Sequence, residues 1–353
     1  MKGRVLVAMS GGVDSSVAAL LLKAEGYDVA GVTMCLGVKD NHEGRVACCG
    51  RDAIEDARKV CQKLKVSHHV FDYSEELKKY VIDRFISDYM QGRTPNPCIE
   101  CNRHLKFRIL LQQALALGFD YLATGHYGRI ERDRDGPYLV RPKDREKDQT
   151  YFLYTIPIEK LDNILFPLAS YTKNQVRMLA MSADLPVALK NESQDICFVT
   201  QKNYREFLLE HTEGIKPGPI VDEQERELGE HRGIAYYTVG QRTGLGVSHR
   251  FPLYVVSIDA ARNLIVVGRK RSLNTRQLAA GELNLLTPQL PGRASAQIRY
   301  GSNSSACTLA LDGVHRLNIL FDQPISAVTP GQSVVCYSED RVLGGGIIEK
   351  GLT

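Results

Sequence analysis

Residues 9–16, Met-Ser-Gly-Gly-Val-Asp-Ser-Ser, determine the fold class of this chain. They follow an apolar, strand-like segment at residues 4–8 and precede a helical pattern at residues 16–23. The two glycines can adopt positive φ and carry no side chain, so successive backbone N–H groups can converge on an anion. The following helix, which we expect to begin at Ser15, adds unpaired N–H groups and a positive dipole end. The stretch therefore predicts a phosphate-binding loop rather than an ordinary Gly-Gly turn.

The side chains of this loop extend the prediction. Ser10, Ser15 and Ser16 offer hydroxyl donors, and Asp14 can hold a divalent cation beside the phosphates. The loop is not a Walker loop, because the lysine of G-x-x-x-x-G-K-[ST] is missing, and it is not G-x-G-x-x-G. The pattern S-G-G-x-D-S-S resembles the pyrophosphate loop of ATP pyrophosphatases, which split ATP into AMP and pyrophosphate to adenylate a carbonyl oxygen.

Composition limits the class of protein further. The chain has 353 residues, 45 basic and 41 acidic residues and a net charge of +4, which excludes a strongly basic scaffold but leaves room for local nucleic-acid surfaces. The N-terminal apolar run of about six residues is too short for a signal peptide or a membrane span. Nine cysteines lack the spacing of a disulfide framework. We expect a cytoplasmic protein with reduced thiols and no membrane partner.

The pattern of the chain changes along its length. In the first part, strand-like runs alternate with amphipathic stretches; the runs are residues 5–9, 29–34, 68–71 and 121–124, and the stretches are residues 18–24, 53–64, 77–90 and 105–117. This alternation predicts an α/β fold with a doubly wound parallel sheet that binds its ligand at the carboxyl ends of the strands. A hairpin is expected within residues 129–140, and helical periodicity returns at residues 149–183.

Beyond residue 216 the helical signal fades and short β-like runs follow. They are residues 254–258 and 264–267, paired as a hairpin, and residues 294–300, 307–311, 317–321, 333–337 and 346–349. Short strands at this spacing predict a small β-barrel. We therefore expect a doubly wound N-terminal domain at residues 1–205, a small central domain at 206–277 and a C-terminal β-barrel at 278–353.

Two cysteine segments carry further chemistry. A proline-stiffened loop at residues 94–102 delivers Cys98 and Cys101 at C-x-x-C spacing, and Cys101 or Asn102 could open the next helix. A thiol at a helix N-terminus is a better nucleophile or metal ligand. The second segment places the lone Cys197 among polar residues. A structural pair or thioredoxin-like redox chemistry are the alternatives, whereas a zinc ribbon lacks a second C-x-x-C pair.

Together these segments resemble the tRNA-specific 2-thiouridylases over essentially the whole chain. The matching motifs are residues 10–16, 96–102, 124–127, 147–153, 193–198, 233–242 and 296–300. The resemblance implies ATP-dependent insertion of sulfur at C2 of the wobble uridine of tRNA, a cytoplasmic reaction that needs ATP and Mg²⁺. The implied partners are the Lys, Glu and Gln tRNAs and a protein that donates persulfide sulfur.

The resemblance also assigns roles to individual residues. The catalytic thiols are Cys101 and Cys197, with the persulfide on Cys197 and a Cys101–Cys197 disulfide after sulfur release. The nucleotide would contact Ala8, Met9, Ser10, Gly11, Gly12, Val13, Asp14, Ser15, Met34 and Gly125. The tRNA would contact Asn96, Pro97, Cys98, His126, Lys147, Asp148, Gln149, Arg299, Tyr300 and Gln332, with the target base flipped out of its stack.

One departure from the family pattern opens an alternative chemistry. Many members carry an aspartate, with a general acid/base role, where this chain has Cys98, and a thiol titrates far higher than a carboxylic acid. Cys98, Cys101 and Cys197 could instead form a three-thiolate site for a [4Fe-4S] cluster with one open iron. Two other functions compete: an ATP pyrophosphatase acting on a small molecule, such as an amide-forming or argininosuccinate-type synthetase, and a non-catalytic RNA-binding module.

Overall fold

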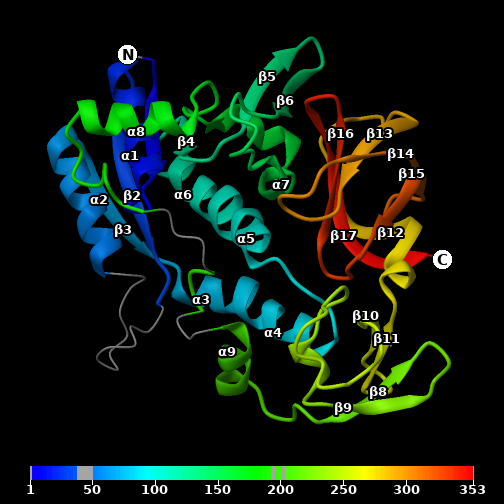
Figure 1. The fold of residues 1–353 in the computed structure, drawn as a ribbon. Helices are drawn as coiled ribbons and strands as arrows, with labels where there is room; N and C mark the ends of the chain where they lie inside the picture. Colours follow the sequence, from blue (N-terminus) through cyan, green and yellow to red (C-terminus); the bar gives the residue numbers. More distant parts are fainter. Residues whose placement is uncertain (1, 38–50, 192–195, 200–202, 353) are drawn as a thin grey trace. The chain divides into compact units, whose positions relative to one another are not determined.

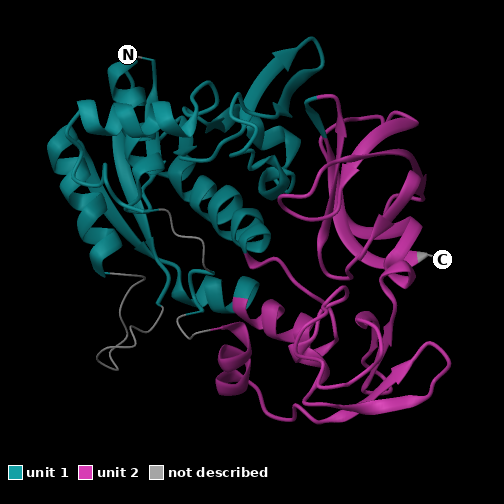
Figure 2. Ribbon diagram, viewed as in Figure 1, with its two compact units in different colours: residues 1–81, 98–200, 340–342 teal, residues 82–97, 201–339, 343–353 magenta. Residues whose placement is uncertain are grey.

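The computed structural model describes residues 2–37, 51–191, 196–199 and 203–352. They form two compact units, shown in Figure 2. The first comprises residues 1–81, 98–200 and 340–342, and the second comprises residues 82–97, 201–339 and 343–353. The chain thus leaves the first unit at residue 82 and returns to it at residue 98. The expected domain boundaries after residues 205 and 277 stay a prediction.

A five-stranded parallel sheet forms the centre of the first unit (Figure 1). Its strands are β1 (Arg4–Ala8), β2 (Asp28–Cys35), β3 (Ser67–Asp72), β4 (Tyr121–Thr124) and β7 (Ile164–Leu165). The order is β3-β2-β1-β4-β7, and every neighbouring pair is parallel. Because the order reverses at β1, the carboxyl ends of β1 and β4 flank a topological switch point, where α/β sheets bind ligands. The predicted doubly wound sheet is confirmed.

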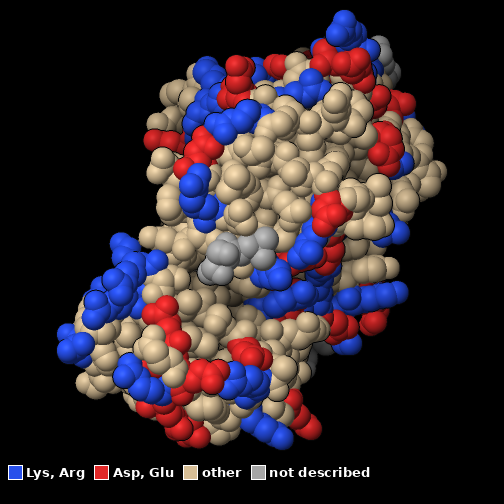
Figure 3. Space-filling model, turned by 90° about the vertical axis from the view of Figure 1, so that its right-hand side faces the viewer, with Lys and Arg blue, Asp and Glu red and all other residues tan. Residues whose placement is uncertain are grey.

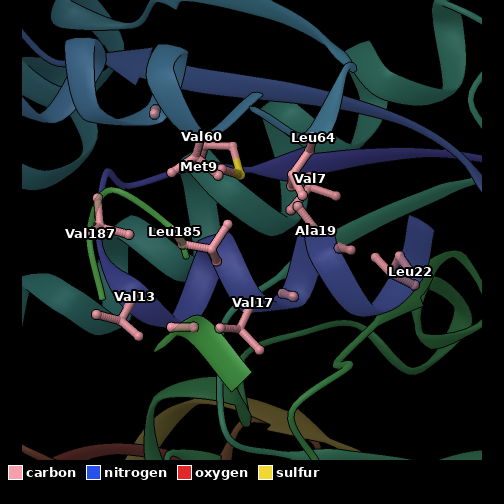
Figure 4. Packing of buried hydrophobic residues seen from close by; sticks show 14 of the residues in the cluster. Val7, Met9, Val13, Val17, Ala19, Leu22, Val60, Leu64, Leu185 and Val187 are labelled. Atoms are coloured by element: carbon pink, nitrogen blue, oxygen red, sulfur yellow. The ribbon is translucent and has the colours of Figure 1, made fainter. Parts of the chain in front are cut away.

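Helices α1 (Val13–Ala24), α2 (Arg51–Leu64) and α8 (Lys173–Ser182) pack into one apolar core with this sheet. Figure 4 shows Val17 of α1, Val60 of α2 and Val7 of β1 within this core. Helix α8 begins with a capping box, in which Thr172 and Gln175 satisfy each other's backbone N–H groups. The cap fixes the start of α8 and therefore the position of Lys173, its first residue.

Several helices differ from the expected bounds. Helix α1 begins at Val13, not at Ser15. The helix expected at 77–90 runs through α3 (Ser74–Leu77), the π-helical η1 (Lys78–Ile82) and α4 (Asp83–Met90). The helix expected at 105–117 begins earlier, through α5 (Pro97–Glu100), the π-helical η2 (Cys101–Leu110) and α6 (Leu111–Ala116). The C-x-x-C pair is therefore helical, because Pro97 suits the first position of a helix.

The expected helical stretch at residues 149–183 is broken into short pieces. These are α7 (Thr150–Leu153), the 3₁₀ helix η3 (Ile158–Asn163), strand β7 and helix α8. The expected hairpin is present as β5 (Arg129–Asp133) and β6 (Gly136–Val140). Cys35, at the end of β2, is disulfide-bonded, so the expectation of reduced thiols is wrong at this position.

The second unit contains a four-stranded sheet and a closed barrel. The sheet has the order β10-β11-β8-β9, with strands β8 (Gly218–Asp222), β9 (Glu227–His231), β10 (Tyr254–Asp259) and β11 (Leu264–Gly268). Six strands form the barrel, β12 (Asn274–Leu285), β13 (Arg293–Gln297), β14 (Ser305–Asp312), β15 (Arg316–Ser326), β16 (Ser333–Ser338) and β17 (Arg341–Leu352). Pairing of β12 with β17 closes it and leaves no free edge. The predicted central domain and barrel are confirmed as fold elements.

Segment 82–97 is held in the second unit by aromatic and backbone contacts. Tyr89 of α4 stacks on Tyr204 of α9 (Tyr204–His211) with ring centroids 4.6 Å apart. The Thr94 N–H donates to the Pro330 carbonyl, at 2.8 Å. The remaining short helices of this unit are η4 (Ile234–Tyr236) and η5 (Lys270–Leu273). Among the described residues, none of the helices combines the length and apolar character needed to cross a bilayer.

Candidate functional site

The loop between β1 and α1 has the geometry of an anion cradle. Gly11 has φ +68°, and a Cβ there would lie 2.4 Å from the Ala53 carbonyl oxygen, so only glycine fits. Gly12 is the N-cap of α1 and has no side chain that could cap the first-turn N–H groups. The Ser15 hydroxyl accepts from the Ser10 N–H at 3.1 Å and orders the loop. The first turn of α1 therefore presents N–H groups and a positive dipole end to a ligand.

The turn after β4 forms the opposite wall of this cradle. A Cβ on Gly125 would lie 2.6 Å from the Ser15 nitrogen, so glycine allows the backbone to approach the start of α1 closely. The next residue, His126, shares a hydrogen bond of 2.7 Å between its Nδ1 and the Thr124 hydroxyl. Burial, reinforced by the Lys106 ammonium, holds the pKa of His126 well below its ordinary value. His126 is therefore neutral at physiological pH. Met34, near the end of β2, is half-buried.

Asp14, in the first turn of α1, is held by two side chains to which the sequence analysis assigned no role. The Lys173 ammonium donates to both carboxylate oxygens, each at 2.7 Å, and the Tyr127 hydroxyl donates to one of them at 3.0 Å. The Lys173 side chain is 11% exposed and that of Asp14 is 31% exposed. The Lys173 N–H donates to an Asp144 carboxylate oxygen at 2.8 Å, which adds to the capping box in fixing this residue.

A second lysine reaches the same loop. The Lys190 ammonium donates to the Gly11 carbonyl at 3.1 Å and to an Asp56 carboxylate oxygen at 2.6 Å. The loop has no lysine of its own, yet two ammonium groups from distant residues approach it. The capping-box letters around Lys173 could have predicted the start of α8. They could not have predicted which residue it faces, because that depends on the packing of α8 against α1.

The three thiols that the sequence singled out all lie in the first unit. Cys98 is exposed and Cys101 partly exposed, both in the first turns of the helix that begins at Pro97. Loss of hydration nevertheless raises the pKa of both thiols, and the Lys106 ammonium opposes this effect. The expected thiolate stabilisation at the helix N-terminus is thus not the dominant effect. Cys197 is exposed, in a turn beside the buried Phe198.

Other cysteines have different surroundings. Cys61, Cys307 and Cys336 are buried, and burial raises the pKa of Cys61 and of Cys307 to about 11. Buried thiols of this kind are inert. The sequence motifs therefore separate the accessible thiols from the structural ones. Ser193, Gln194 and Asp195 of the Cys197 motif lie outside the described residues.

The expected tRNA contacts of the first unit are partly engaged in its own fold. Asp148 accepts from the Thr150 N–H at 2.9 Å and pairs with Arg141. The Gln149 side chain accepts from the Tyr127 N–H at 2.9 Å. These contacts shape the segment around Lys147, which is half-buried. Their assignment to RNA stays a prediction.

The remaining expected tRNA contacts lie in the second unit. The Gln332 amide donates to the Thr94 carbonyl at 2.9 Å, so it supports the segment that leads to Asn96 and Pro97. Arg299 is exposed and donates to the Ala327 carbonyl at 2.7 Å. Tyr300 has 45% of its surface exposed, enough to offer a ring face to a base.

Of the two metal groups that the sequence led us to expect, the side chains around the cradle suit Mg²⁺ and not a [4Fe-4S] cluster. Mg²⁺ usually takes one or two carboxylates plus substrate phosphates, and Asp14 provides such a carboxylate beside the loop. A [4Fe-4S] cluster needs converging thiolates. Within residues 2–37, 51–191, 196–199 and 203–352, no three His, Cys, Asp or Glu side chains converge as metal ligands. Cys98, Cys101 and Cys197 therefore do not form a cluster site in this conformation.

An uncapped loop before α1, a parallel sheet whose order reverses at β1 and a carboxylate–ammonium pair beside the loop define an α/β nucleotide-binding protein. Residues 3–201 match the tRNA methyl transferase HUP domain, residues 205–269 the tRNA methyl transferase PRC-barrel domain, and residues 275–348 the aminomethyltransferase beta-barrel domain.

Named relatives specify the family. The tRNA-specific 2-thiouridylase MnmA 1 of Syntrophus aciditrophicus (strain SB) is 57% identical, covering 100% of this chain and 94% of the relative. The tRNA-specific 2-thiouridylase MnmA of Moorella thermoacetica (strain ATCC 39073 / JCM 9320) is 48% identical, covering 98% and 99%. The chain belongs to the tRNA-specific 2-thiouridylase family, as its motifs indicated. Among solved structures, a 4-thiouridine synthetase–RNA complex with bound ATP has TM-score 0.39 and 17% identity, covering 59% of this chain and 50% of that chain.

Proposed function

We propose that this protein uses ATP to exchange the C2 oxygen of a tRNA wobble uridine for sulfur. The observation that carries the proposal is that one compact unit holds both the anion cradle with its Asp14–Lys173 pair and the accessible thiols Cys101 and Cys197. Relatives aligned over the whole chain are 2-thiouridylases, and this favours the proposal over an ATP pyrophosphatase acting on a small molecule. The thiols also fit sulfur insertion better than the methyl transfer that the domain descriptions mention.

The cradle would carry out the first half of the reaction. The N–H groups at the start of α1 would bind the phosphates of ATP while the uracil C2 oxygen attacks the α-phosphorus and pyrophosphate leaves. Mg²⁺, held by Asp14 and the phosphates, would neutralise phosphate charge. Lys173 would then turn from Asp14 towards the departing pyrophosphate. The backbone at Gly125 would line the nucleotide, and the neutral His126 beside it would meet the tRNA without adding a competing charge.

The thiols would carry out the second half. The terminal sulfur of a Cys197 persulfide would attack C2, and AMP would leave with the former C2 oxygen. The Cys101 thiolate would attack the Cys197 Sγ, breaking its bond to the transferred sulfur. This releases 2-thiouridine and leaves a Cys101–Cys197 disulfide, which an external dithiol reduces. In the alternative, Cys101 first displaces AMP from C2 and the terminal sulfur of the Cys197 persulfide then displaces Cys101. The freed Cys101 thiolate attacks the Cys197 Sγ as before, so the products are the same.

We propose the finer assignments on the same basis. The substrates would be the Lys, Glu and Gln tRNAs, the sulfur donor would be a persulfide-bearing protein, and the reaction would take place in the cytoplasm. The expected contacts of Asn96, Pro97, Cys98 and Lys147 with RNA belong here too. A [4Fe-4S] cluster on the three thiols is the competing route, and no step is assigned to it because these thiols do not converge.

Mass spectrometry of tRNA nucleosides tests the proposal. Unmodified tRNA is incubated with the protein, a persulfide donor, a dithiol and ATP, and 2-thiouridine is expected only when ATP is present. Cys197→Ser is the matched control for sulfur delivery, and an ATP analogue with an uncleavable α–β bridge is the control for adenylation. Formation of 2-thiouridine without ATP, or by Cys197→Ser, would contradict it. Iron and sulfide analysis after anaerobic purification separates the two routes: an active, iron-free enzyme excludes the cluster.

A further inference from the structure

A loop of the second unit, residues 240–253, forms a site to which the proposed chemistry gives no role. It follows η4 and precedes β10, and it carries the glycine-rich sequence Gly-Gln-Arg-Thr-Gly-Leu-Gly-Val. Arg242 and residues 244–247 and 249–253 of this loop line a cavity of about 410 Å³. That volume lies within the range of pockets that bind small molecules or single units of a polymer.

Buried side chains and hydrogen bonds anchor this loop. Leu245 and Leu253 are 5% and 8% exposed and belong to the apolar core beneath the four-stranded sheet. The Gln241 side chain accepts from the Thr238 N–H at 3.2 Å and donates to the Thr243 carbonyl at 3.0 Å. Gln241 at one end and Leu253 at the other therefore tie the loop to the rest of the second unit.

Two exposed side chains of this loop carry a positive charge. Arg242 and Arg250 are exposed on the loop, and three further exposed cations, Arg269, Lys270 and Arg271, follow β11. In the described part of the chain none of these five has an acidic residue within ion-pair distance, whereas many other arginines do. The five positive charges exceed the net charge of +4 of the whole chain. Figure 3 likewise shows Lys and Arg gathered in clusters on the face that it draws.

An aromatic ring holds two of these cations in place. The Arg269 guanidinium lies 3.9 Å and the Arg250 guanidinium 5.3 Å from the centre of the Phe251 ring, and His249 packs edge-on against it at 4.1 Å. Stacking on an aromatic ring orients a guanidinium while leaving its N–H groups available. Glu223, an acidic residue close to η5, accepts a hydrogen bond of 3.0 Å from Ser272 instead.

We propose that this cluster, Arg242, Arg250, Arg269, Lys270 and Arg271, binds the phosphodiester backbone of the substrate tRNA. Guanidinium groups match phosphate oxygens in a two-pronged geometry. Cations without an acidic partner gain affinity for a polyanion because binding releases its counterions. The inference depends on the proposed function only for the identity of the RNA. It gives the central domain a part in docking, which none of the predicted contacts did.

Equilibrium binding tests the inference without requiring turnover. The triple variant Arg242→Ala/Arg250→Ala/Arg269→Ala is compared with wild type by fluorescence anisotropy of labelled, unmodified tRNA across a salt series. For every phosphate that the variant no longer neutralises, the slope of log K against log salt should become shallower by about 0.7–0.9. We expect affinity to fall about tenfold or more near 0.1 M salt. ATP binding should be unchanged, because the cradle lies in the other unit.

Two controls keep the result interpretable. Lys59→Ala/Arg108→Ala/Lys216→Ala removes the same charge from exposed positions elsewhere and should change the slope much less. The triple Arg→Lys variant keeps the charge and should recover most of the slope; far-UV circular dichroism checks that each variant folds.

If the alanine triple binds tRNA with wild-type slope and affinity, the proposal is wrong. Unchanged tRNA binding with weaker binding of the persulfide donor protein would also overturn it and assign the surface to protein docking. If the alanine triple variant binds tRNA more weakly but still thiolates it at saturating tRNA, the result supports docking. If the wild-type protein itself produces no 2-thiouridine, only the proposed function is contradicted.

Discussion

Replacing Lys173 by methionine removes an ammonium that contacts both oxygens of Asp14 at 2.7 Å while keeping most of the side-chain volume. Removing one partner of a fully buried ion pair costs about 3–5 kcal/mol, and an exposed pair contributes about 0–1 kcal/mol. Asp14 is 31% exposed and keeps the Tyr127 hydroxyl, so the loss of stability should fall between these limits, at about 1–3 kcal/mol.

The effect on catalysis is separate from the effect on stability. If Lys173 donates to phosphate in the transition state, the variant loses one charge-assisted hydrogen bond, about 1.5–3 kcal/mol. The value of kcat/KM for ATP should then fall roughly 10- to 150-fold. Pyrophosphate release in the presence of tRNA measures this loss, and urea unfolding measures the stability.

A matched control comes from another lysine pair in the same unit. Lys63 pairs with Asp184, but these side chains are 37% and 94% exposed, so Lys63→Met should cost less than about 1 kcal/mol and leave kcat/KM unchanged. Lys173→Arg should recover part of the activity. If Lys173→Met loses stability but keeps wild-type kcat/KM for ATP, Lys173 is only a structural partner of Asp14 and its proposed contact with phosphate is wrong.

The site supports three further predictions. Cys101→Ser and Cys197→Ser should each abolish 2-thiouridine formation while tRNA affinity changes less than about threefold, within the roughly 0.5 kcal/mol typical of surface changes; loss of tRNA binding would contradict a purely chemical role. Gly11→Ala should weaken ATP binding at least tenfold, since its Cβ would lie 2.4 Å from the Ala53 carbonyl oxygen, and calorimetry with ATP measures this. The lowered pKa of His126 means that the unfolded chain binds a proton at higher pH than the folded one. The free energy of unfolding should therefore decline as pH falls below about 6.5; a His126→Gln variant with the same acid dependence would disprove this cause.

Local sequence patterns predicted those parts of the fold that depend on residues close together in the sequence. The strand–loop–helix junction at residues 4–24 could be read because the strand, the glycines and the helix are adjacent in sequence. Strand β12 was missed because its sequence has a single β-branched residue, Thr275, and lacks the pattern of a typical strand; barrel closure with β17 determines its structure. Residues 94–102 were expected to be a loop with a helix opening at Cys101 or Asn102, whereas Pro97 already begins the helix here.

The candidate site also combines residues that local motifs predicted with residues that only long-range packing brings in. The loop, Gly125 and the cysteines are sequence motifs, and the structure places them all in one unit. Lys173 and Lys190 could not be predicted, because their contacts join positions more than 150 residues apart. The loss of hydration around Cys98 and Cys101 depends on the surrounding packing as well. The position of these thiols at a helix N-terminus predicted lowered pKa values, whereas burial raises them.

The path of segment 82–97 has a consequence for synthesis on the ribosome. Its partners Pro330 and Gln332 are translated more than 230 residues after Thr94, although the first unit is nearly complete by residue 200. At about 5–20 residues per second, the nascent segment waits roughly 10–50 s for them. The aromatic face of α4 waits only about half as long, because its stacking partner Tyr204 follows Tyr89 by 115 residues (204 − 89). Slowing elongation late in the message should therefore lower the yield of intact enzyme more than slowing it early.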